Sequence, residues 1–131
     1  MTHKLTLPIL AVAGLLAAPM GAGAASPAPK ACFFAHELSS WREAGDKTVN
    51  LRVGVSDVYQ LKLLAPCPDL PFAESIGVET SNGSSNICSG LDISLIVPSS
   101  VTHTVPQRCM ATSLRRLTPE EAKALPAREK P

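Results

Sequence analysis

The chain has 131 residues and nearly balanced charge, with 12 basic and 11 acidic side chains and a formal net charge of +1. This length gives one domain and too little chain for two hydrophobic cores. The charge balance excludes the strong basic excess of a nucleic-acid-binding protein and the polybasic patch of a membrane-surface protein.

An N-terminal apolar run predicts a cleaved signal peptide over residues 1–25. Residues 5–18 are largely apolar and follow His3 and Lys4, and the small residues Ala22-Gly23-Ala24 come next. A helix that crosses a bilayer needs about 20 apolar residues, which is more than this run supplies. We therefore expect export to the periplasm or the medium, with no stable membrane insertion after cleavage.

Residues 26–31 form a flexible, proline-containing lead-in to the first predicted strand. This strand is expected to run from Cys32 to about Trp41, and Gly45 and Asp46 form the turn that follows. Glycine adopts the positive φ that such a turn needs, and aspartate accepts hydrogen bonds from downstream amides.

Two segments with alternating polarity predict a β-hairpin. Valine and leucine alternate with other residues over 49–55, and the same alternation returns over 59–63. A period of two is typical of strands that have one buried and one solvated face. Asn50 and Arg52 are expected on the solvated face.

The middle of the chain combines a proline-rich loop with a second predicted hairpin. Residues 65–72 contain three prolines and are expected to form a loop or a single helical turn. Asn82-Gly83 is a strong hairpin-turn signal because both residues tolerate positive φ. Residues 87–88 are expected to return from this turn alongside Gly77 and Val78.

The last third of the chain adds two predicted strands and one helix. The strands are expected over residues 91–97 and 108–117, with a polar loop at 99–107 between them. Thr118-Pro119-Glu120-Glu121 has the pattern of a capping box with proline at the first helical position. The short helix is expected to end near Leu125, and the charged tail at 126–131 is expected to be frayed.

Together these elements predict a mainly β fold: a small antiparallel barrel or sandwich of six or seven short strands with one short C-terminal helix. The pattern contains no strand–helix–strand crossover, which disfavours a parallel α/β sheet. Residues 32–125 are expected to form one domain that is stapled by disulfide bonds.

The residues with the most specific chemistry are four cysteines: Cys32, Cys67, Cys88 and Cys109. Their spacing contains no C-x-x-C motif and no nearby histidine pair, so we expect no metal site and no cofactor. In an exported chain they are expected to form two disulfides. Three pairings are possible. The second predicted hairpin favours a bond between Cys67 and Cys88. Closure of the sheet, which would place the first strand beside the last, favours a bond between Cys32 and Cys109.

The candidate catalytic groups outside the signal segment are two histidines and four aspartates: His36, His103, Asp46, Asp57, Asp69 and Asp92. Each aspartate also has a structural interpretation, because it lies in a turn, in a loop or on a solvated strand face. No G-x-S-x-G turn frames a serine nucleophile. We therefore expect a protein that is not an enzyme.

Three further motifs have both a structural and a functional interpretation. Trp41 and Arg42 are candidates for a ligand-stacking pair or for the cap of a small core. Asn82-Gly83-Ser84 matches a glycosylation acceptor, which the predicted hairpin turn also explains. Arg115 and Arg116 form a surface pair that is too small to indicate a nucleic-acid site.

Residues 32–125 resemble a family of small exported proteins of Gram-negative bacteria that carries a domain-of-unknown-function label. The resemblance rests on the order of Cys32-Phe33-Phe34, Trp41-Arg42, Cys67-Pro68-Asp69-Leu70, Ile87-Cys88-Ser89-Gly90-Leu91-Asp92, Cys109 and Leu117-Thr118-Pro119-Glu120-Glu121. It implies a bacterial periplasmic location. Many relatives are lipoproteins, whereas this chain has no cysteine directly behind its apolar run. The resemblance assigns no catalytic or binding residues.

Two classes of function follow. The first is a non-enzymatic binding or structural module of the bacterial envelope, with another envelope protein as its expected partner, for example at an exposed sheet edge. The alternative is a small periplasmic hydrolase or an enzyme inhibitor. A cleft that brings His36 or His103 within hydrogen-bond reach of an aspartate or serine would favour catalysis, whereas a flat apolar patch would favour binding.

Overall fold

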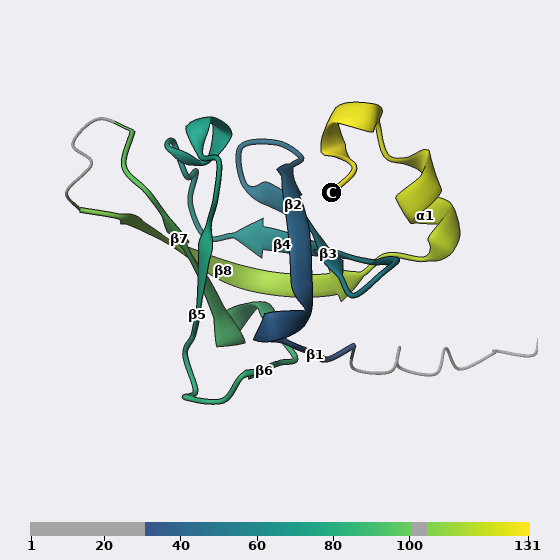
Figure 1. Cartoon of the computed structure of the whole chain (residues 1–131), viewed down its shortest axis with the longest axis horizontal. Helices are drawn as coiled ribbons and strands as arrows, with labels where there is room; N and C mark the ends of the chain where they lie inside the picture. Colours follow the sequence, from purple (N-terminus) through teal and green to yellow (C-terminus); the bar gives the residue numbers. More distant parts are fainter. Residues whose placement is uncertain (1–30, 101–104) are drawn as a thin grey trace, which may run out of the picture.

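The computed structural model describes residues 31–100 and 105–131. The predicted signal peptide, almost all of the lead-in and His103 lie outside these residues. The described chain is mainly β, with one short helix and four 3-10 turns (Figure 1). The elements are β1 (Phe33–Phe34), η1 (Ala35–Glu37), β2 (Leu38–Glu43), β3 (Thr48–Val53), β4 (Asp57–Leu63), η2 (Leu70–Phe72), β5 (Gly77–Thr80), β6 (Asn86–Ile87), η3 (Gly90–Asp92), β7 (Ile93–Val97), β8 (Gln107–Arg116), α1 (Pro119–Ala124) and η4 (Ala127–Glu129).

Six of the strands form one antiparallel sheet that curves into a half-barrel, in the order β2-β3-β4-β8-β7-β5 (Figure 1). β1 and β6 form a separate two-stranded sheet. The predicted mainly β class and the short C-terminal helix are confirmed. The number of strands is higher than expected, because η1 divides the first predicted strand into β1 and β2. Among the described residues, no helix is both long enough and apolar enough to cross a membrane.

The predicted hairpin of β3 and β4 is confirmed, and it supplies the centre of the core. Leu51 pairs with Tyr59, and Val49 pairs with Leu61. These side chains are almost completely buried, as the alternation of polarity predicts. The ring of Phe33 packs on Tyr59 with ring centroids 4.8 Å apart, which joins β1 to this core.

The second predicted hairpin is wrong in its strand pairing. Gly83 does adopt a positive φ of 68°, and the Oδ1 atom of Asn82 accepts a hydrogen bond from the Ser84 amide. However, β5 pairs with β7, and β6 pairs with β1, where Ile87 lies opposite Phe33. Both of these side chains are buried, so the apolar surface of the core draws β6 away from β5.

The four cysteines form two disulfides, but the predicted pairing is wrong. Cys32 is bonded to Cys88, and Cys67 is bonded to Cys109, with Cα–Cα distances of 4.2 Å and 5.9 Å. The pairing of β1 with β6 brings the first two cysteines together. The prediction placed the first and last strands side by side, whereas β8 lies in the middle of the sheet beside the loop that carries Cys67.

A close backbone contact joins η3 to β8. A Cβ atom added at the buried Gly90 would lie 2.2 Å from the Ser113 amide nitrogen and 2.5 Å from its Cα atom. Asp92 organises this 3-10 turn, because its Oδ2 atom accepts hydrogen bonds from the amides of Cys88 and Ser89 at 3.0 Å and 2.9 Å. Only glycine fits at this point of the chain.

The C-terminal segment begins as predicted and ends differently. The Thr118 hydroxyl accepts a hydrogen bond from the Glu121 amide, and α1 starts at Pro119, so the capping box is confirmed. The expectation of a frayed tail at 126–131 is wrong. This tail forms η4, Pro131 is buried, and the segment lies against β2 and β3 (Figure 1).

Candidate functional site

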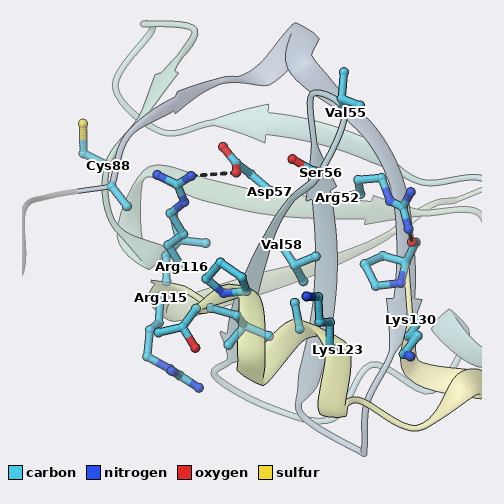
Figure 2. A pocket seen from close by; sticks show the side chains of 17 residues that line it. Arg52, Val55, Ser56, Asp57, Val58, Cys88, Arg115, Arg116, Lys123 and Lys130 are labelled. Carbon is cyan, nitrogen blue, oxygen red and sulfur yellow. Dashed lines mark hydrogen bonds and ion pairs between the residues drawn. The ribbon is translucent and has the colours of Figure 1, made fainter.

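A cavity with a volume of about 950 Å³ lies between the turn that joins β3 to β4, the end of β8 and the C-terminal segment (Figure 2). We call it the basic groove. Its cationic lining residues are Arg52, Arg115, Arg116, Lys123 and Lys130. Its apolar lining residues include Val55, Val58, Leu114, Leu117 and Pro119.

The positive charge of the basic groove is only partly neutralised. Among the described residues that line the groove, Asp57 has the one acidic side chain, and this carboxylate accepts a hydrogen bond from Arg116 Nη2 at 2.6 Å. Within the part of the chain that the structure describes, no ion pair involves Arg52, Lys123 or Lys130. Lys123 and Lys130 are thus left without a carboxylate neighbour among the described residues, whereas Arg52 Nη2 already donates to the Pro131 main-chain oxygen.

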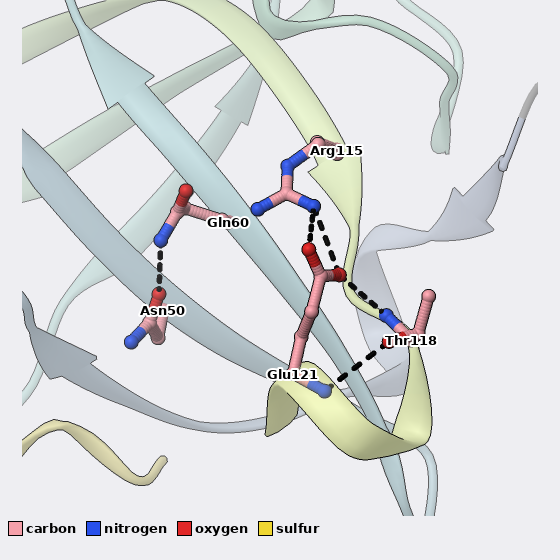
Figure 3. A network of polar contacts seen from close by, with 5 residues as sticks. All are labelled: Asn50, Gln60, Arg115, Thr118 and Glu121. Carbon is pink, nitrogen blue, oxygen red and sulfur yellow. Dashed lines mark hydrogen bonds and ion pairs between the residues drawn. The ribbon is translucent and has the colours of Figure 1, made fainter. Parts of the chain in front are cut away.

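A polar network fixes the start of α1 against β8 (Figure 3). Arg115 Nη1 donates to both carboxylate oxygens of Glu121, at 2.8 Å and 2.9 Å. The same carboxylate accepts from the Thr118 amide at 2.8 Å. The hydrogen bond from the Thr118 amide, helped by Arg115, holds the pKa of Glu121 below the ordinary glutamate value of 4.5. This network ties one wall of the groove to the sheet.

The capping network is expected to weaken in acid. A carboxyl group with a lowered pKa stabilises the folded state above its unfolded pKa, and this contribution is lost as the pH falls through its folded pKa. Above pH 4.5, the Thr118 amide signal should therefore be independent of Glu121 ionisation, and below it the signal should shift. NMR titration of the wild type and of Glu121→Gln measures this. A shift centred above pH 4.5, or one that persists in the variant, would contradict the assignment.

The second wall of the groove is held by a buried amide. Asn50 was expected on the solvated face of β3, but its exposed fraction is 0%. Its Nδ2 atom donates to the Glu129 carbonyl oxygen at 2.9 Å, and its Oδ1 atom accepts from Gln60 at 3.4 Å (Figure 3). Arg52 Nη2 donates to the Pro131 carbonyl oxygen (Figure 2). The C-terminal segment therefore covers polar groups that the strand pattern alone places in solvent.

Replacing Asn50 by alanine is expected to lower the free energy of unfolding by about 1–2 kcal/mol, because the Glu129 carbonyl loses the donor that the buried Asn50 side chain supplies. The amide of Glu129, which bonds to Pro126, should then exchange faster with deuterium. Urea denaturation and hydrogen exchange measure the two effects. Asn82→Ala, which removes an exposed turn amide, is the matched control and should leave Glu129 exchange unchanged. Equal protection of Glu129 in both variants would contradict this role for Asn50.

The candidate stacking pair, Trp41 and Arg42, lines a second cavity with a volume of about 710 Å³. Trp41 is half-buried and packs against the core, while Arg42 Nη1 donates to the Trp41 carbonyl oxygen at 3.0 Å. Burial, together with the negative charge of Asp46, raises the pKa of Glu43 in this lining. The indole thus has the core-capping role, and charges of both signs surround the cavity.

The candidate catalytic residues have separate local partners. His36 stacks on the exposed Phe34 ring, with ring centroids 5.6 Å apart. Asp69 accepts a hydrogen bond from Ser100 Oγ at 2.5 Å, and Asp92 caps η3. In residues 31–100 and 105–131, no hydrogen bond or ion pair joins His36 to an aspartate or serine, and no group of three or more histidine, cysteine and acidic residues could hold a metal ion.

The basic groove does not follow from the sequence pattern. Arg115 and Arg116 were recognised as a surface pair, whereas Lys123 and Lys130 belong to the helix and tail that were not expected to pack together with β3. The signal that could have found the site is the excess of cationic residues after residue 107, but only the folded tail places them opposite Arg52.

Comparison with known proteins gives one match. A family model described as a family of unknown function (DUF6491) matches residues 1–130. No curated protein and no solved structure matches the chain.

Proposed function

We propose a function for this chain, which belongs to DUF6491, a family of unknown function, from the geometry of the basic groove. The protein is a non-enzymatic binding module of the bacterial envelope, and it holds an anionic partner in the basic groove. One observation carries this proposal. The described part of the chain lines the groove with five cationic side chains, a single acidic one and several apolar residues.

The chemistry of the groove supports binding over catalysis. Its acidic residue, Asp57, is held by Arg116, and the cysteine in its lining, Cys88, is part of a disulfide. Nucleophilic catalysis needs a nucleophile beside a free base. A volume of about 950 Å³ is close to the upper end of small-molecule pockets, so the groove also has room for a segment of another protein.

Two observations support an envelope location. Both disulfides fit an oxidising compartment, such as the bacterial periplasm or the medium. The apolar N-terminal run has the pattern of a signal peptide. We propose a periplasmic or secreted protein of a Gram-negative bacterium, with another envelope protein as its partner.

A photo-crosslinking amino acid at Val55 tests the proposal in the cells that produce the protein. Val55 is 92% exposed at the edge of the groove, so an aromatic replacement does not disturb packing. We expect a crosslinked adduct with an envelope protein that decreases when Lys123 and Lys130 are both changed to glutamate.

Phe72 is the matched control position, because it is 75% exposed and lies outside the lining of the groove. Adducts that are equal at Val55 and Phe72, or that are unaffected by the two charge reversals, would contradict a binding role for the basic groove. No adduct at either position would also count against a protein partner.

A further inference from the structure

We propose that the basic groove takes an extended segment of a partner protein in which acidic and apolar residues alternate. This inference rests on the proposed function and names the chemistry of the occupant. It is carried by the distribution of charge along the groove and by the apolar residues that line it.

The cationic groups are spread along the groove. Figure 2 shows Arg115 and Arg116 at one end, Lys123 in the middle, and Arg52 with Lys130 at the other end. An anionic lipid presents its charge at a single headgroup, which such a row does not match. A chain with repeated carboxylates matches it along its whole length.

The cationic side chains of the groove differ in whether they already contact a carboxylate of this chain. Arg115 and Arg116 already contact Glu121 and Asp57. Lys123 and Lys130 have no ion pair within the described residues, whereas Arg52 Nη2 donates to the Pro131 main-chain oxygen. The carboxylates of the occupant therefore meet Lys123 and Lys130, which are both exposed.

The floor of the groove requires apolar side chains between those carboxylates. Val55 and Pro119, which line the groove, are exposed, and Leu114 is half-buried, so these apolar side chains are open to an occupant. In an extended chain, successive side chains point to opposite sides with a rise of about 3.3 Å per residue. Alternation of glutamate or aspartate with valine or leucine places apolar groups on the floor and carboxylates toward the cationic residues.

Fluorescence anisotropy with a labelled synthetic peptide tests the inference. The probe is a six-residue peptide of alternating glutamate and valine with blocked ends, and the matched probe has glutamine in place of glutamate. We expect the acidic probe to bind more tightly and to weaken as salt is raised, because exposed ion pairs are screened. Lys123→Gln and Lys130→Gln should each weaken binding by about threefold, as expected for exposed ion pairs.

Arg108→Gln is the control variant. It also removes an exposed cationic side chain, but Arg108 pairs with Glu79 on β5 and does not line the groove. It should bind the acidic probe like the wild type. Equal binding of the acidic and glutamine probes, or equal weakening by Arg108→Gln, would overturn the inference.

Two further outcomes separate the inference from the proposed function. If the crosslink at Val55 forms but the acidic peptide does not compete for it, the binding module stands and the acidic segment is wrong. If vesicles of phosphatidylglycerol and phosphatidylethanolamine bind through Lys123 and Lys130 while the peptide does not, the occupant is a lipid surface and the inference fails.

Discussion

Simultaneous replacement of Cys67 and Cys109 by alanine is expected to lower the free energy of unfolding by about 4 kcal/mol in the chain-entropy model of disulfides. The bond spans 42 residues, and both cysteines are buried, with exposed fractions of 4% and 5%. Loss of the bond therefore frees a long loop in the unfolded chain and also leaves space in the core. Urea denaturation of the wild type and the variant, without reductant, measures the difference.

The other disulfide provides the control. Cys32–Cys88 spans 56 residues, so chain entropy alone predicts a similar effect, but Cys32 is exposed and Cys88 is half-buried. Mild thiol should reduce this bond first, because exposed disulfides are the more labile ones. Peptide mapping after cleavage with trypsin and a glutamate-specific protease should link Cys32 to Cys88. A fragment that links Cys67 to Cys88 would contradict the pairing and the expected energies together.

Replacing Gly90 by alanine is expected to lower the free energy of unfolding by about 3 kcal/mol, at the upper end of ordinary overpacking. The added methyl group would overlap the backbone of Ser113 on β8, where the amide nitrogen lies 2.2 Å from its position. β8 is a central strand of the sheet, so its backbone does not shift aside as the end of a flexible side chain does. The 3-10 turn η3 must shift instead, and the hydrogen bonds to Asp92 are disturbed with it.

Gly83→Ala is the matched glycine control. Its surroundings are open, because no atom of the described residues other than its two chain neighbours lies within 4 Å of the added methyl group, but its φ is 68°. Alanine in this left-handed conformation costs about 1 kcal/mol. Thermal or urea denaturation of both variants should show the larger loss at Gly90. An effect at Gly90 no greater than that at Gly83 would mean that η3 is loosely attached to β8.

The strands with one buried face could be predicted from the sequence, and strands whose partners are distant could not. β3 and β4 alternate in polarity, and the turn between them is short, so their pairing and their apolar core residues follow from local pattern, whereas the burial of Asn50 does not. The pairing of β8 with β4 shifts its register between Lys62 and Leu63 of β4. Cys109 and Ala111 face the core on one side of it, whereas Met110 is 55% exposed, and no local signal marks this change.

The pairing errors have one physical origin. The turn at Asn82-Gly83 was identified correctly, but a turn fixes only the direction of the chain nearby. The partner of β6 is chosen by burial, because Ile87 completes the core beside Phe33. The disulfide prediction followed the incorrect strand neighbours and was wrong for the same reason.

The basic groove could not be predicted because only some of the segments that form its walls have a recognisable sequence pattern. The capping box located the start of α1, and the alternation of β3 located Arg52. The tail at 126–131 has no periodic apolar pattern. Its position depends on backbone carbonyl groups of Glu129 and Pro131 that accept hydrogen bonds from side chains on β3, and the sequence of the tail does not reveal which carbonyl groups are used.

The central place of β8 in the sheet sets the order in which the molecule can assemble. β8 is the last strand along the chain, yet it joins β4 on one side to β7 on the other, and its Thr112 meets Lys62 across a sequence separation of 50. Until it arrives, the β2-β3-β4 and β7-β5 groups have unpaired edges, which are prone to wrong association. Such non-local pairing makes folding slow, so a chain that is synthesised N-terminus first completes this sheet only after β8 has emerged.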